Sequence, residues 1–500
     1  MKIGAWLCVW LLMVFVRPPV QAQESPEQWR RDGRTAVAKA RQLTPITTKA
    51  RNVILFIGDG MGVSTITAAR ILEGQQHGQT GEENRLSFET LPYTALIKTY
   101  NTNQQTPDSA GTMTAIVTGV KTKAGVLSVN QNVITSDHTS VKGNSLTTIL
   151  ELAERAGLST GVVTTTTVTH ATPAACYAHS PQRRWENDSQ LPPKALEDRF
   201  PDIARQLIEF SIGDGLEVVL GGGRRHFLPD TEKDPEAADQ TGMRKDGRNL
   251  AGEWLRNPQS AYVWNRSQFN EIDAAKTDHL LGLFAPSNLT FEHDRNEGET
   301  SQPSLSEMTQ KALAILSKNK KGFFLMVEGG RIDHAHHGGS AYHALTEVIE
   351  FSNAVRVAMN STNRRETLII VTADHSHVFT FGADATRGNP VLGKVVKNDP
   401  VTGTPIKGYA LDKLGLPYTA VGYANGPGYA KTAKGRPDLN SIDTADHHYR
   451  PESAVPLTFE SHGGEDVPLY ADGPHAYLFH GLLEQNVIFH VMVEALELAD

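Results

Sequence analysis

The sequence predicts an α/β protein with a large, mostly parallel central sheet flanked by helices. Four short runs rich in β-branched and aromatic residues have the pattern of strands, and each ends abruptly at polar residues. Helical patterns lie between these runs, for example over residues 145–156 and 306–317. Alternation of strands and helices is typical of a parallel sheet covered by helices, and we expect that architecture in this chain of 500 residues.

Each predicted strand ends at residue types that commonly bind metal ions. The strands and the residues after them are 52–57 before Asp59, 160–168 before His170, 323–327 before Glu328, and 367–372 before Asp374 and His375. The carboxyl ends of parallel strands meet at one edge of the sheet, where ligands bind. A single acid in such a place is more often a turn residue, but four such ends together predict a metal site.

A histidine-rich segment, residues 331–337, adds further metal-binding groups. Asp333 and His337 are four positions apart, so a helix would place both on one face, as in known zinc sites. His334 and His336 would then face elsewhere, and we expect each of them to form a hydrogen bond or to face solvent rather than to bind metal directly.

A zinc site of this kind needs a third ligand from a distant segment. His462 lies among small residues in a loop-like stretch. The doublet His447–His448 fits equally well. The spacing alone leaves both possibilities open.

Ser109 is the candidate nucleophile. It follows Pro107 and Asp108 and precedes an apolar stretch, residues 113–117, so it falls at or near a helix N-terminus. Unpaired N–H groups and the positive end of the helix dipole favour a phosphoryl group or an alkoxide there. Serine is also a common helix cap, and the segment alone favours that simpler role. No histidine adjoins Ser109, and none is needed where a metal ion lowers the pKa of the hydroxyl.

The N-terminus has the pattern of an export signal over residues 1–22. Lys2 precedes an apolar run of 14 residues, 3–16, and a small-residue cleavage site ends at Ala22. The alternative is a membrane anchor, but a run of this length is short for a bilayer core of about 30 Å. We expect an exported enzyme, periplasmic or secreted, with no stable membrane anchor. After cleavage only Cys176 remains, so no internal disulfide can form.

The composition is that of an ordinary globular protein, with 39% hydrophobic and 21% charged residues. The net charge of -8 is spread over a long chain with both signs interspersed. This pattern argues against a nucleic-acid-binding surface.

Five long motifs resemble the alkaline phosphatase family, and its animal branch more than its enterobacterial branch, over roughly Asn52 to Ala495. They are NVILFIGDGMG (52–62), TPDSAGTMTA (106–115), VEGGRIDHAHH (327–337), TADHSHVFTFG (372–382) and HGGEDVPLYADGP (462–474). The resemblance implies a single catalytic domain over residues 23–500. It also implies metal-dependent hydrolysis of phosphate monoesters through a phosphoserine intermediate, which releases inorganic phosphate and an alcohol.

The resemblance also implies a role for each candidate residue. Ser109 would be phosphorylated, and Arg183, rather than Arg184, would bind the phosphate. The resemblance implies two Zn2+ and one Mg2+ per subunit. One zinc would be held by Asp333, His337 and His462, and the other by Asp59, Asp374 and His375, with Ser109 completing its shell. Magnesium would be held by Asp59, Thr172 and Glu328, with His170 close by and acting through a bound water. His170 stands where the enterobacterial branch has an acid.

Residues 380–460 interrupt the strand pattern and are rich in glycine, proline, asparagine and aspartate. The resemblance implies a crown-like insertion that helps to form a homodimer, whereas the sequence alone fits a substrate lid equally well. The animal branch also has a calcium site. Glu236 could stand for one ligand, but Ala285 and Gln302 replace two others, so we expect no calcium site.

Three other functions use comparable residues. A sulfatase would need Pro and Arg at fixed spacing after its nucleophile, and residues 109–112 do not offer them. A phosphodiesterase is harder to distinguish from a phosphomonoesterase. The distinction requires a comparison of a monoester and a diester that have the same leaving group. A protein that only binds or stores metal would need neither Ser109 nor Arg183.

Overall fold

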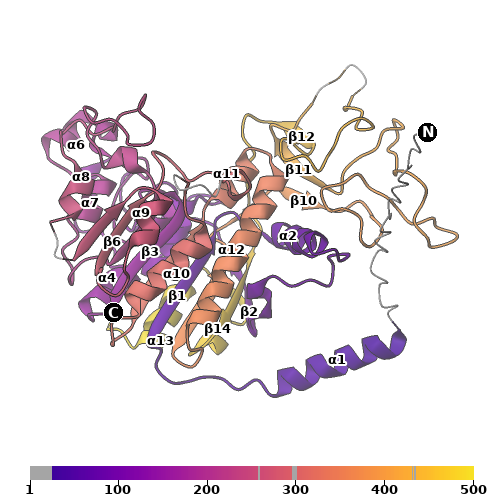
Figure 1. Ribbon diagram of the computed structural model, residues 1–500, viewed down its shortest axis with the longest axis horizontal. Coiled ribbons are helices and arrows are strands. Elements are labelled where there is room, and N and C mark those ends of the chain that lie inside the picture. Colours follow the sequence, from indigo (N-terminus) through magenta and orange to yellow (C-terminus); the bar gives the residue numbers. More distant parts are fainter. Residues whose placement is uncertain (1–24, 257–258, 296–300, 431, 433–434, 500) are drawn as a thin grey trace, which may run out of the picture. The chain divides into compact units, whose positions relative to one another are not determined.

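Ten strands of the described chain form one sheet, the core of the fold (Figure 1). In spatial order they are β15 (Gly481–Glu484), β2 (Tyr93–Lys98), β14 (Val467–Asp472), β8 (Thr367–Thr372), β1 (Asn52–Gly58), β7 (Phe323–Gly329), β3 (Ser159–Thr167), β4 (Val218–Gly222), β6 (His279–Leu283) and β5 (Ser260–Val263). From β8 to β5 every neighbouring pair is parallel. The prediction of a large, mostly parallel sheet is therefore confirmed.

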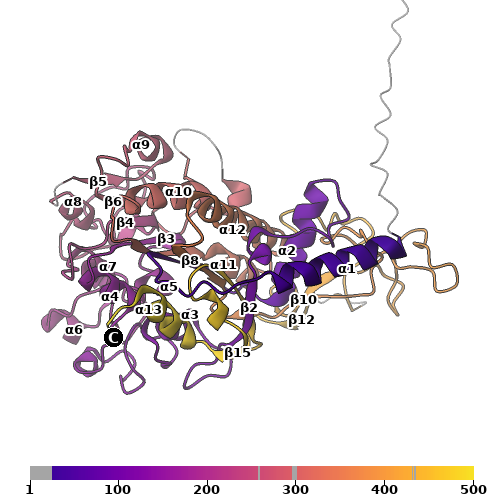
Figure 2. The ribbon, with the colours of Figure 1, turned by 90° about the horizontal axis from the view of Figure 1, so that it is seen from below.

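Helices cover both faces of this sheet, as Figure 2 shows. On one face α10 (Leu305–Leu316) and α12 (Ala341–Ser361) pack against each other and on the central strands. On the other face lie α4 (Ile149–Arg155) and α13 (Val487–Leu496). Helices α4 and α10 correspond to the two helical patterns of the sequence. Burial on both faces explains why β1, β7 and β8 are almost continuously apolar.

The remaining helices of the described chain are short or lie around the sheet. The α-helices are α2 (Val63–Gln76), α3 (Ser109–Thr118), α5 (Ala171–Ala174), α6 (Pro193–Glu197), α7 (Ile203–Ile208), α8 (Leu250–Trp254), α9 (Arg266–Glu271) and α11 (Arg331–His337). The 3-10 helices are η1 (Ser87–Thr90), η2 (His138–Val141), η3 (Asp188–Gln190), η4 (Arg224–His226), η5 (Glu292–Asp294) and η6 (Ala476–Leu478).

Strand β14 is the exception to the parallel order. It runs antiparallel to both of its neighbours, β8 and β2. It is also one of the last strands along the described chain. A parallel strand could have the same apolar sequence, so its direction was not predicted.

The predicted insertion, residues 380–460, consists mainly of turns around a small sheet of its own. That sheet contains β10 (Phe379–Phe381), β11 (Val421–Gly426) and β12 (Ser453–Pro456). Val395, Ala410 and Ala420 form a separate apolar cluster within it. A short antiparallel pair then connects β9 (Ser376–His377) to β13 (His462–Gly463). This pair brings residues 85 positions apart to the same place in the fold, since His377 lies opposite His462.

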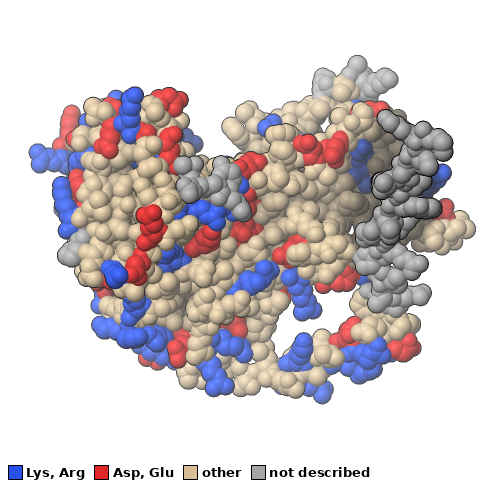
Figure 3. Space-filling model, in the orientation of Figure 1, with Lys and Arg blue, Asp and Glu red and all other residues tan. Residues whose placement is uncertain are grey.

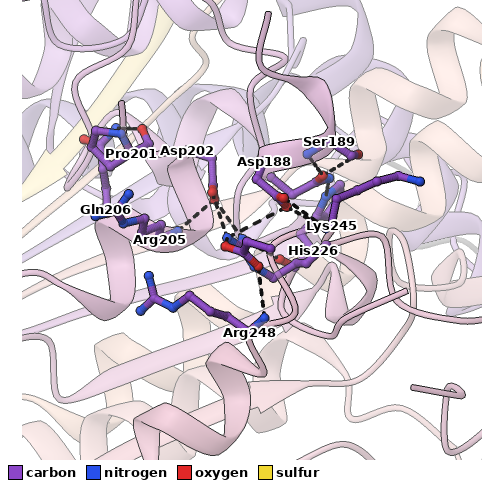
Figure 4. Close-up of polar contacts among 12 residues, drawn as sticks. Asp188, Ser189, Pro201, Asp202, Arg205, Gln206, His226, Lys245 and Arg248 are labelled. Atoms are coloured by element: carbon purple, nitrogen blue, oxygen red, sulfur yellow. Dashed lines mark hydrogen bonds and ion pairs between the residues drawn. The ribbon is translucent and has the colours of Figure 1, made fainter. Parts of the chain in front are cut away.

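A buried ionic cluster fixes the segment between β3 and β5. The guanidinium of Arg244 is fully buried and donates hydrogen bonds to Asp202 (3.0 and 3.1 Å) and Asp246. The carboxylate of Asp188 accepts from the backbone N–H of Lys245 at 2.9 Å (Figure 4). Because every charge in the cluster has a partner, we interpret it as structural rather than catalytic.

The structure describes residues 25–256, 259–295, 301–430, 432 and 435–499; the predicted signal, residues 1–22, lies outside them. The chain divides into two units at Thr44. The first contains α1 (Pro26–Arg41), a helix with no buried residue. No helix of the described residues has both the length and the apolar character required to cross a membrane. On the face drawn in Figure 3, acidic and basic side chains are interspersed.

Candidate active site

The register of the sheet brings the predicted strand-end residues together. Ile57 of β1 pairs with Glu328 of β7 on one side and with Thr372 of β8 on the other. Asp59 and Asp374 each lie two residues beyond the Ile57–Thr372 pair. The loops that follow the two strands are in contact, since the N–H of Gly60 donates to Oδ1 of Asp374 at 3.1 Å. Gly60 has φ +71°, and an added Cβ would lie 2.3 Å from the ring of His377. The site therefore requires glycine there.

The first group of metal-binding side chains is centred on Asp333. Its Oδ1 lies 3.3 Å from Nε2 of His337 and 3.3 Å from Nε2 of His462. The Nδ1 atoms of both histidines face backbone carbonyls, of Glu460 at 2.6 Å and of Pro107 at 2.7 Å. A ring whose Nδ1–H donates to a carbonyl presents the lone pair of Nε2. The two Nε2 atoms are 3.1 Å apart and are thus oriented to share one cation.

His377 joins this group, and the sequence analysis did not single it out. Its Nε2 lies 2.7 Å from Oδ1 of Asp333, and its Nδ1 contacts the carboxylate of Glu460. Burial lowers the pKa of His377, but Glu460 and Asp333 outweigh that effect and raise it to about 10. A charged His377 would donate a hydrogen bond from Nε2 to Oδ1 of Asp333 and so fix the orientation of that carboxylate. The only feature of the sequence that points to His377 as part of the site is its position two residues after His375.

The second group surrounds Ser109. Nε2 of His375 lies 3.2 Å from Oγ of Ser109, 3.3 Å from Oδ1 of Asp59 and 3.4 Å from Oδ2 of Asp374. Asp59, Asp374 and His375 are fully buried. Oδ2 of Asp374 also accepts a hydrogen bond from Thr112 at 3.2 Å, which links this group to helix α3.

Helix α3 places Ser109 at its first residue. The cap is Asp108, whose Oδ1 accepts a hydrogen bond from the N–H of Gly111 at 3.1 Å. Because Asp108 caps the helix, the hydroxyl of Ser109 does not have to, and it points instead to His375. The capping role that the segment alone favoured is thus filled by the neighbouring residue.

The third group lies on the far side of Asp59. Asp59, His170 and Glu328 each offer a ligand atom within 4.8 Å of the others. Glu328 accepts hydrogen bonds from Thr164 and Thr166 through Oε2. Several of the site's buried atoms have no hydrogen-bond partner within the described chain: both carboxylate oxygens of Asp59, Oε1 of Glu328, Oγ1 of Thr172 and Nδ1 of His170.

Arg183 reaches the same place from the loop after α5. Its Nη1 donates to Oδ2 of Asp108 at 3.0 Å, and its Nη2 lies 3.1 Å from Nε2 of His170. Asp108 thus both caps α3 and positions Arg183. The neighbouring Arg184 is exposed to solvent.

The acids of the site have strongly perturbed protonation. Burial raises the pKa of Asp59 well above its usual value, with further contributions from Asp374 and Asp333. Burial likewise raises the pKa of Asp374 and brings that of Glu328 to about 7. Buried carboxylates with unpartnered oxygens are unstable as anions unless a cation compensates them. The carboxylate and imidazole donors here are those that zinc and magnesium use, so the residues fit both ions.

Other candidate residues lie outside these groups. His336 is buried between Thr65 (3.0 Å) and Tyr423 (2.9 Å), and His334 contacts Arg331 (3.0 Å), so both form the hydrogen bonds expected of them. His447, of the competing doublet, lies against His293 instead.

None of the three residues at the positions of the calcium site offers a free carboxylate. Glu236 accepts a hydrogen bond from Arg224 at 2.7 Å, and Gln302 accepts one from the N–H of Thr290 at 2.8 Å. Ala285 is buried and offers no side-chain oxygen. The absence of calcium binding remains a prediction.

Known proteins are similar to this chain over nearly its whole length. The tissue-nonspecific alkaline phosphatase of Rattus norvegicus is 46% identical over 483 residues, which cover 95% of this chain and 89% of that protein. The alkaline phosphatase of Gadus morhua is 44% identical over 95% of this chain and 98% of its own length. Among solved structures, that of Thermus thermophilus alkaline phosphatase has a TM-score of 0.63 at 26% identity and covers 92% of this chain and 94% of its own. The sequence model of the alkaline phosphatase family matches residues 50–498, and the chain belongs to that family.

Proposed function

We propose that Ser109 is the nucleophile of this phosphoric monoester hydrolase and that two zinc ions and one magnesium ion surround it. The observation that carries the proposal is the position of Ser109 Oγ. It lies 3.2 Å from His375, at the first residue of a helix and beside buried carboxylates with unpartnered oxygens. That environment suits an alkoxide attacking a phosphate in the presence of cations.

Three sets of side chains would hold the ions. One zinc would be bound by Asp333, His337 and His462, and the other by Asp59, Asp374 and His375. Magnesium would be bound by Asp59, Thr172 and Glu328, with His170 close by. The first set would supply three protein ligands, which is the number that catalytic zinc sites use. The unpartnered atoms of Asp59, Glu328 and Thr172 support the third set.

When bound, the ions would lower the pKa of the Ser109 hydroxyl and offset the negative charge on the entering and leaving oxygens. Ser109 Oγ would then attack the phosphorus while the P–O bond to the leaving oxygen breaks, and that oxygen takes up the proton that Ser109 loses and departs as the alcohol. Water attacks the resulting phosphoserine, which releases inorganic phosphate and restores the serine. The positive end of α3 favours the phosphoryl group throughout.

Arg183 would bind the phosphate itself. Its guanidinium is planar and can donate to two phosphate oxygens at once, which lysine cannot do. Asp108 holds it at 3.0 Å and so keeps it at the N-terminus of the helix that carries Ser109. This arrangement favours a dianionic monoester over a diester, which has one charged oxygen fewer to bind.

The proposal also covers the location, the oligomeric state and the substrates of the enzyme. We propose that it is exported, to the periplasm or the medium, and that the insertion at residues 380–460 contributes to a homodimer. Its substrates are phosphate monoesters and, given the interspersed surface charge, not nucleic acids.

Metal removal tests the proposal. The purified full-length chain should hydrolyse a chromogenic phosphate monoester at alkaline pH, lose activity on chelation and regain it with Zn2+ and Mg2+. A phosphate diester with the same leaving group should react much more slowly. A folded, zinc-loaded sample that hydrolyses neither ester would contradict the proposal.

A further inference from the structure

We infer that His293, Asp294 and His447 form a surface site for a zinc-class transition metal ion, separate from the active site. One ligand atom from each of the three lies within 4.8 Å of the others. His293 and Asp294 belong to η5, whereas His447 belongs to the insertion, 153 positions further along the chain from Asp294. His293 and Asp294 are exposed and His447 is half-buried, so an ion could enter from solvent.

Neighbouring side chains already orient His293 and Asp294. Oδ2 of Asp294 lies 3.1 Å from Nε2 of His343, whose Nδ1 lies 2.7 Å from Oγ of Ser340. The hydroxyl of Tyr342 lies 3.3 Å from Nδ1 of His293. Hydrogen bonds to the rear atoms of potential ligands fix the ring and carboxylate orientations and leave the other donor atom available. The start of α12 therefore acts as a support for the site.

The donor set selects the type of ion. Two imidazoles and one carboxylate match the mixed nitrogen and oxygen ligands of zinc, with a fourth position left for water. Imidazole is a poor ligand for calcium and magnesium, which prefer sets made of oxygen alone. We therefore expect Zn2+ to bind and Ca2+ or Mg2+ not to.

A second combination shares His447, namely Asp446, His447 and His448. Oδ1 of Asp446 already accepts the backbone N–H of His448 at 2.7 Å, which closes a local turn. The combination with His293 draws its ligands from two distant segments and has the supporting hydrogen bonds, so it is the better metal site.

An ion at this site would connect the insertion to the active-site helix. Phe291, next to η5, packs its ring 4.7 Å from that of His343, and the guanidinium of Arg331 lies 3.7 Å from the centre of the Phe291 ring. Arg331 is the first residue of α11, which carries Asp333 and His337. The ion would thus restrain the position of the insertion relative to α11.

The test is the number of zinc ions per chain, measured by elemental analysis after equilibrium dialysis against micromolar Zn2+. The wild type and the control His448→Ala should each bind one zinc more than His293→Ala and His447→Ala. Hydrolysis of a chromogenic phosphate monoester should stay unchanged in all four chains. Because the result is a difference between variants, it holds whatever number of ions the active site takes.

Equal zinc content in all four chains would overturn the proposal, and loss of the same ion in His448→Ala would assign it to the second combination instead. Should a variant fail to fold, a second experiment on the wild type alone tests the site. Added Zn2+, but not Ca2+, should protect His293 and His447 from acylation by diethylpyrocarbonate. Unprotected histidines at saturating Zn2+ would contradict the site.

Discussion

The hydroxyl of Ser109 lies 3.2 Å from Nε2 of His375, although the two residues are 266 positions apart. The contact exists because α3 begins at Ser109 and because β8 ends just before Asp374. Neither ring nitrogen of His375 is needed as a base if Nε2 binds a metal, because the ion itself lowers the pKa of the serine.

Replacement of Ser109 by alanine should lower turnover by several orders of magnitude and leave the metal content unchanged. The side chain supplies the attacking oxygen, whereas each ion keeps three ligands from other residues, such as Asp59, Asp374 and His375 for the zinc beside Ser109. Turnover of a chromogenic monoester and metals per chain should be measured on the same sample. Near-normal turnover with full metal occupancy would show that another group is the nucleophile.

Arg183→Ala should lower kcat/KM by about 100- to 10,000-fold, because Arg183 would donate two charge-assisted hydrogen bonds to the phosphate and each contributes about 1.5–3 kcal/mol. Arg184→Ala is the matched control and should behave like the wild type, since that side chain is exposed. Steady-state kinetics and the inhibition constant of inorganic phosphate would report the loss. The opposite ranking of the two variants would mean that the phosphate arginine is Arg184.

Calcium should not raise the thermal midpoint of the apo or zinc-loaded protein. Glu236 is paired with Arg224, and Ala285 and Gln302 supply no carboxylate. Thermal unfolding with and without Ca2+ checks this, with Mg2+ as the control for general ionic effects. A clear rise specific to Ca2+ would show that other oxygens complete a site in this region.

Glu154 should make the protein less stable as the pH rises. Burial raises its pKa from 4.5 to about 9, while Thr160 donates a hydrogen bond to it at 2.5 Å. Its contribution is fully present below pH 4.5 and is lost as the pH rises to about 9, because the folded chain keeps a proton that the unfolded chain releases. Glu154→Gln, which can still accept from Thr160, should therefore raise the thermal midpoint at pH 9 more than at pH 6.

Glu197→Gln is the control for this experiment, since Glu197 is exposed. Its midpoint should change equally little at both values of pH. If Glu154→Gln gave the same shift at pH 6 and pH 9, the effect would be one of packing and not of ionisation.

Much of this arrangement could be predicted from the sequence because it depends on local signals. Each of the four strands has its own apolar run, and the parallel order brings their ends to one edge. The helical spacing of Asp333 and His337 was likewise visible. What could not be predicted depends on contacts between distant segments, such as the pairing of β9 with β13 that brings His377 to Asp333.

The cap of α3 shows the limit of local reasoning. Asp108 and Ser109 are both good capping residues, and the sequence offers no reason to choose between them. In the structure Asp108 also receives the N–H of Gly125 (3.0 Å) and the side chain of Arg183 (3.0 Å). These distant partners hold Asp108 at the cap, so the Ser109 hydroxyl is free of the capping role and points to His375.

The antiparallel strand β14 sets the order in which a growing chain can be completed. It fills the gap between β8 and β2, yet it leaves the ribosome only after more than nine tenths of the chain has been made. Until then the sheet remains split, and His462, just ahead of β14, has not met Asp333. In any folding order that follows the direction of synthesis, the metal-binding centre around Asp333 is therefore completed late.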